Sequence, residues 1–123
     1  MYYFFALIVP PNTSVDNPVF MRLPLDRGTI SFLELHFAPG CVGLVRSAVA
    51  YKSIQIVPWN ADTWLFGDDR LFKLDLNLEL NEPPYELTVK GWSEDDTYPH
   101  TLTVGVMLVE ANAVNMLQLL LGS

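Results

Sequence analysis

The chain has 123 residues, of which half are hydrophobic and 17% are charged. This length suits one domain, and this composition excludes disordered, collagen-like and coiled-coil proteins. Seven basic against fourteen acidic residues give a net charge of −7. Because nucleic acids and anionic membranes are bound through Lys and Arg at the phosphates, this charge argues against both as partners. The single cysteine, Cys41, excludes an internal disulfide and a thiolate-rich zinc site.

The apolar segment 1–9 is predicted to be a core strand and not an export signal. No Lys or Arg precedes the apolar run and Pro10 follows it directly, so the pattern of a secretory signal is missing. No uninterrupted apolar run approaches the roughly 20 residues that cross a bilayer. The aromatic residues at 2–5 suit a pleated sheet. We therefore expect no signal peptide, no transmembrane segment and folding in the cytoplasm.

Nine prolines and seven glycines separate short apolar runs, a pattern typical of an all-β sandwich. The clearest strand is 72–80, where every even position is apolar and every odd position is polar. The same alternation returns at 85–90 and 102–106, so the three segments predict an antiparallel meander. In 29–37 the parity slips, which predicts either a β-bulge near Phe32–Leu33 or burial on both faces.

Further strands are predicted at 2–9, 19–25, 42–50 and 54–57. Pro24 confines the second of these to an edge or to a break in the ladder. The predicted fold is all-β: an antiparallel β-sandwich, jelly-roll or immunoglobulin-like, of about eight strands. We expect this domain in residues 1–110 and a short C-terminal helix in the apolar tail 111–123.

The tail carries apolar residues at helical spacing, with Gly122 as a C-terminal cap. A helix of about 12 residues is marginal alone and needs a surface to pack against. That surface is either the chain's own sandwich or a neighbouring subunit; a tail strand pairing with another sheet is a third alternative. If the tail forms an interface, the residues involved are Val114, Met116, Leu117, Leu120 and Leu121.

The sequence contains no motif for phosphate binding, zinc proteolysis or a serine nucleophile, so we predict no catalytic residues and no enzyme. The two histidines, His36 and His100, are expected to be structural or surface residues. Cys41 follows a Pro-Gly pair at the junction of a loop and a strand. Nothing nearby fixes a base or a positive charge to activate the thiol, so we expect it to be buried and inert.

Acidic residues cluster in two predicted loops, with Asp68 and Asp69 in the first and Asp95 and Asp96 in the second. Calcium favours carboxylate and carbonyl oxygens gathered on loops, and two loops at one end of a sandwich could supply them. Aspartate also favours turns because it hydrogen-bonds to the nearby backbone. The spacing fits no EF-hand, so no cofactor is predicted beyond this calcium alternative.

Aromatic residues collect near the acidic loops: Trp59, Trp64, Trp92 and Tyr98. They could plug the ends of the sandwich or lie in a subunit interface. Alternatively, exposed tryptophans beside carboxylates form a stacking platform for sugars, since the ring offers a flat apolar face with a polar rim.

Segments 83–92 and 94–101 resemble small uncharacterised β-sandwich proteins encoded among the virion structural genes of tailed phages and related viruses. The resemblance implies an all-β building block that decorates or joins a capsid in several copies, located in the virion and assembled in the host cytoplasm. The leading hypothesis is therefore a non-enzymatic structural module that associates with itself or with a larger assembly such as a capsid. The alternative is a carbohydrate-binding module with calcium support.

Overall fold

The computed structural model describes residues 1–60 and 62–110, which form nine strands and no helix. The strands are β1 (Tyr2–Val9), β2 (Val19–Pro24), β3 (Gly28–Phe37), β4 (Val45–Tyr51), β5 (Ile54–Val57), β6 (Leu65–Phe66), β7 (Arg70–Leu80), β8 (Glu86–Ser93) and β9 (His100–Glu110). No helix long and apolar enough to cross a membrane was found in these residues. The predicted C-terminal helix and its apolar stripe lie outside the described residues.

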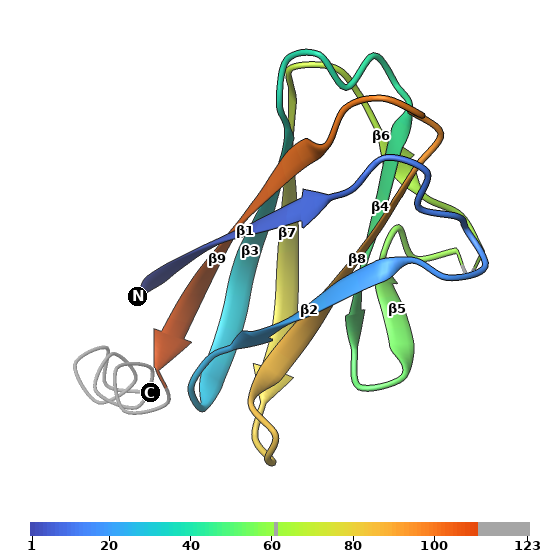
Figure 1. The fold of residues 1–123 in the computed structure, drawn as a ribbon. Helices are drawn as coiled ribbons and strands as arrows, with labels where there is room; N and C mark the ends of the chain where they lie inside the picture. The colour runs from blue at the N-terminus through green and yellow to red at the C-terminus, as the bar shows by residue number, and fades with distance from the viewer. Residues whose placement is uncertain (61, 111–123) are drawn as a thin grey trace, which may run out of the picture.

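The strands form two antiparallel sheets that pack face to face (Figure 1). Sheet A has the order β1-β9-β3-β7, and sheet B has the order β2-β8-β4-β5 with the short β6 also paired to β4. The prediction of an all-β antiparallel sandwich is confirmed. The two-residue strand β6 was not predicted, because two residues are too few to show an alternation.

The pairing order identifies the topology as a jelly roll. β1 pairs with β9, β2 with β8, β3 with β7, and β4 with β5. The first half of the chain therefore pairs with the second half in reverse order, as in a long hairpin that is rolled into two sheets. The predicted meander of the last three strands is wrong, since β8 belongs to sheet B while β7 and β9 lie on either side of β3. Alternation reveals which face of a strand is buried but not which strand lies beside it.

The core lies between the sheets and consists of the inward side chains of the strands of both. The largest side chains that are fully buried are Phe37, Leu23, Ile30, Leu33, Leu35, Leu80, Leu87, Leu102, Leu108, Val9, Val45 and Val49. The alternation predicted for β7 is confirmed, because Leu74, Leu76 and Leu78 pack against this core. Pro24 ends β2, an edge strand of sheet B, as its missing amide hydrogen requires.

A β-bulge interrupts β3, as the slip in parity predicts. Ile30 and Phe32 face the consecutive residues Leu108 and Met107 of β9, so Ser31 has no residue opposite it there. The bulge restores inward burial for Leu33 and turns Phe32 to the outer face of sheet A. There the Phe32 ring lies 6.3 Å from the ring of Tyr2 in β1.

Gly91 tests how tightly the two sheets pack. A Cβ atom at this position of β8 would lie 2.8 Å from Val9 Cγ2 and 3.4 Å from Leu102 Cδ1. Because such an atom overpacks the core, we expect Gly91→Ala to lower the free energy of unfolding by about 1–3 kcal/mol, measured by urea denaturation. Lys90→Ala, on the outer face of the same strand, is the control and should change it by less than about 0.5 kcal/mol. Equal midpoints for both variants would contradict this packing.

Candidate functional site

The outer face of sheet A is apolar along β1 and charged along β7. Inward residues of β1, such as Tyr3 and Phe5, pack against the core. The outward residues Tyr2, Phe4 and Ile8 are 45%, 65% and 63% exposed. On β7 the outward residues are mainly charged or polar: Lys73, Asp75, Asn77 and Glu79. A contiguous exposed apolar strip of this kind marks an interaction surface more often than scattered apolar residues do.

A shallow hollow of about 450 Å³ lies on this face over Gly105 of β9. The register places Gly105 between Phe4 of β1 and Glu34 of β3. Tyr2, His36, Leu71 and Thr103 complete the lining. A side chain at Gly105 would overlap the Tyr2 hydroxyl, so the glycine is what allows the tyrosine ring to lie across the sheet. Partial burial, reinforced by the adjacent Glu34 carboxylate, raises the pKa of Tyr2.

Each histidine has an aspartate as its partner. His36 Nε2 lies 3.3 Å from Asp69 Oδ1 on the surface, and His100 Nε2 lies 2.7 Å from Asp95 Oδ2. The second pair is nearly covered, with side chains 9% and 12% exposed. The other carboxylate oxygen of Asp95 accepts hydrogen bonds from the amides of Thr97 and Tyr98. The hydrogen bond from His100, followed by that from Thr97, lowers the pKa of Asp95.

The other candidate calcium ligands, Asp68 and Asp96, also accept hydrogen bonds. Asp68 Oδ1 accepts hydrogen bonds from the amides of Gly40 and Val42, at 2.8 and 3.2 Å, and Asp96 Oδ1 accepts one from the Thr97 hydroxyl. No group of three or more His, Cys, Asp or Glu side chains in residues 1–60 and 62–110 is arranged to hold a metal ion. Asp95 therefore has the local turn bonding that was one of the two interpretations, whereas Asp68 connects its loop to the loop at 40–42.

Cys41 is buried, as expected, at the base of the loop that Asp68 organises. Its amide donates a hydrogen bond to the carbonyl of Ala38. Burial, with a smaller contribution from the Asp68 carboxylate, raises the pKa of the thiol. A raised pKa leaves less thiolate at neutral pH and makes the sulfur a poor nucleophile.

Two of the predicted aromatic residues meet on the outer face of sheet B. The rings of Trp64 and Trp92 pack edge to face, with centroids 6.0 Å apart. The register aligns Phe66, Arg46 and Trp92 in one row across β6, β4 and β8. The Arg46 guanidinium lies 4.5 Å from the Phe66 ring centroid and 5.6 Å from that of Trp92. Arg46 was not predicted from the sequence, since its neighbours come from two distant segments.

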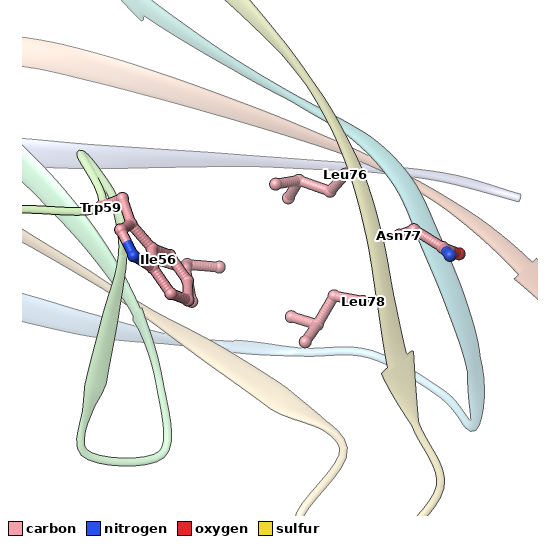
Figure 2. Close-up of a pocket in the computed structure, with 5 residues that line it drawn as sticks. All are labelled: Ile56, Trp59, Leu76, Asn77 and Leu78. Carbon is pink, nitrogen blue, oxygen red and sulfur yellow. The ribbon is translucent and has the colours of Figure 1, made fainter.

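Trp59 lies apart from this pair, where the two sheets open between β5 and β7 (Figure 2). Its side chain is 74% exposed and lines a hollow of about 260 Å³. Figure 2 shows Leu76 and Leu78 pointing across the opening toward Trp59 and Ile56. The three tryptophans therefore do not form one platform. Tyr98, in the loop before β9, is 66% exposed.

Gln55 holds the loop that carries Trp59, a role the sequence did not reveal. Its side-chain amide nitrogen lies 2.8, 3.0 and 3.1 Å from the carbonyl oxygens of Pro58, Asn60 and Thr63, so its two N–H groups are shared among three acceptors. The predicted interface residues of the tail, from Val114 to Leu121, lie outside the described residues, so that interface stays a prediction.

The Asp95–His100 pair predicts a pH-dependent stability. The pKa of Asp95 is lower in the folded protein than in the unfolded chain, so the ionised carboxylate stabilises the fold. This contribution to stability is complete above the ordinary carboxyl pKa of about 4 and is lost as the pH falls through the lower pKa of the folded state. We expect Asp95→Asn to unfold at less urea than wild type at pH 6 and to approach wild type at pH 2–3. Asp96→Asn is the control, since it loses only the contact with a hydroxyl. A difference that persists unchanged into acid would contradict the role of the Asp95 charge.

No family model matches this sequence, and no curated protein is significantly similar to it. Among solved structures, it is similar to Fe(II)-HppE with the alternative substrate (S)-1-HPP, at 8% identity and a TM-score of 0.44, over 86% of this chain and 42% of the other. It is also similar to hydroxypropylphosphonic acid epoxidase from S. wedmorenis in complex with fosfomycin, at 8% identity and a TM-score of 0.43, over 85% of this chain and 42% of the other. A third similar structure is the exo-beta-1,3-galactanase Pc1,3Gal43A from Phanerochaete chrysosporium with galactose, at 14% identity and a TM-score of 0.39, over 87% of this chain and 27% of the other. The chain spans less than half the length of each, and a likeness this distant does not identify a family.

Proposed function

We propose that this chain is a non-enzymatic structural module that associates with copies of itself or with a larger assembly. The observation that carries the proposal is the strip of Tyr2, Phe4 and Ile8 along the outer face of β1. When a partner covers apolar side chains this exposed, the free energy falls by about 25 cal/mol for each Å² of apolar surface removed from water.

The state of the titratable residues supports a structural role. His100 and Cys41 are enclosed: the His100–Asp95 pair has side chains only 9% and 12% exposed, and the Cys41 thiol is buried with a raised pKa. His36, in β3, pairs with Asp69 at the surface. Burial denies His100 and Cys41 the access to substrate that a catalytic base or nucleophile needs.

A virion protein that decorates or joins a capsid is the most specific form of this proposal. The resemblance of segments 83–92 and 94–101 to phage virion proteins supports it. The jelly roll is also a fold used by capsid proteins, although lectins share it, so the topology is compatible with both candidate functions.

Carbohydrate binding is the second candidate, and the exposure of Trp59 favours it. Its ring is 74% exposed beside an apolar hollow, which suits stacking against a sugar ring. For this candidate, a glycan array probed with wild type should show signals that Trp59→Ala loses. Phe20→Ala, at an exposed aromatic position on β2 (65%), is the control, and added EDTA tests the calcium support. Blank arrays for wild type would contradict this candidate.

Solution mass tests the structural proposal. Light scattering after size exclusion should give a defined multiple of the 13.9 kDa chain mass that is independent of added calcium. A mass of 13.9 kDa at every concentration would contradict self-association and leave only binding to a different assembly.

A further inference from the structure

The edges of the two sheets differ in how they are protected. An edge strand exposes unpaired amides and carbonyls that can pair with another chain, and proteins normally block such edges with charges, proline or shortness. β7, the far edge of sheet A, carries Lys73, Asp75 and Glu79 on its outer face. β2, an edge of sheet B, carries Arg22 and Pro24, and on the opposite side β5 and β6 have only four and two residues.

β1 has none of these protections. It pairs with β9 on one side only, and in the described residues no strand pairs with its other side (Figure 1). All eight residues, Tyr2–Val9, lack charge, proline and glycine. β1 is therefore the longest unprotected edge of the sandwich, and it is the strand that also carries the exposed strip Tyr2, Phe4 and Ile8.

The distribution of charge favours a second copy as the occupant of this edge. The chain carries a net charge of −7, so two copies repel each other over most surfaces. β1 contains no acidic residue. The ammonium of Met1, the residue before β1, donates a hydrogen bond to the carbonyl of Leu108 at 2.6 Å in its own chain. Two β1 strands can therefore pair without placing charged side chains of the strands themselves opposite each other. The acidic groups that contact β1 belong to other segments: Glu34 lies beside Tyr2, and Asp26 accepts a hydrogen bond from the Tyr3 hydroxyl.

We propose that β1 pairs with β1 of a second copy about a two-fold axis. A two-fold contact presents the same strand on both sides, so the two strands run antiparallel. The sheets A of the two copies then join into one continuous sheet of eight strands, and the outward side chains of β1 meet their counterparts across the junction. This inference rests on the proposed function, since it names the contact through which the module associates.

Lysines on the outer face of β1 test the contact. Phe4→Lys/Ile8→Lys places two charges per chain where the strands meet, at positions 65% and 63% exposed in the single chain, so each chain should still fold. The matched control is Phe20→Lys/Ile54→Lys, at positions 65% and 61% exposed on β2 and β5, the two edge strands of sheet B, with the same change in net charge. Light scattering over a dilution series should show a dimer for wild type and for the control. The β1 variant should dissociate at least about tenfold more readily, because like charges then face each other.

Hydrogen exchange provides the second readout. In wild type, amides of β1 that point away from β9 should become more protected as the concentration rises, and in the β1 variant they should stay unprotected. If both variants remain assembled equally and these amides exchange freely, association uses another surface; the β1 inference then fails while the proposed function stands. If wild type is a monomer at every concentration, self-association and the β1 contact both fail.

Discussion

The pairing of β3 with both β9 and β7 is the interaction on which sheet A depends. As an inner strand, β3 has both sides hydrogen-bonded, and its inward residues Ile30, Leu33, Leu35 and Phe37 are fully buried. Its bulge sets which residues face outward, so Phe32, Glu34 and His36 line up on the outer face. The hollow over Gly105 and the position of Tyr2 follow from this register, since each needs a specific neighbour across the strands.

The strands themselves were largely predictable because a half-buried strand must alternate in polarity. β7 shows this most plainly, with nine of its residues in the predicted alternation, and the bulge in β3 was visible as a break in parity. Pro24 correctly indicated an edge. Strand order was not predictable in the same way, because both jelly-roll and immunoglobulin-like sandwiches are built from strands with the same local pattern.

The candidate surfaces were less predictable, because they depend on which strands lie side by side. Arg46 acquires its role from Phe66 and Trp92, which the sheet brings to either side of it. In the sequence, nothing distinguishes Gly105 from any other glycine in a predicted strand, and only the structure shows that Tyr2 lies over it. The grouping of tryptophans in the sequence suggested one platform, yet Trp59 lies at the opening between the sheets and Trp64 against Trp92. The neighbours of a residue across the strands are set by the fold and cannot be read from the local sequence.

The pairing of β1 with β9 also constrains how the chain reaches its native state. The partners in this pair are roughly 100 residues apart in sequence, so β1 can pair only once β9 has been made. Until β9 emerges, an uncharged apolar segment has no place in a sheet and is open to non-native contacts. The uncovered apolar strand β1 is therefore the segment most open to aggregation during folding, and sheet A is complete only when β9 has paired with both β1 and β3.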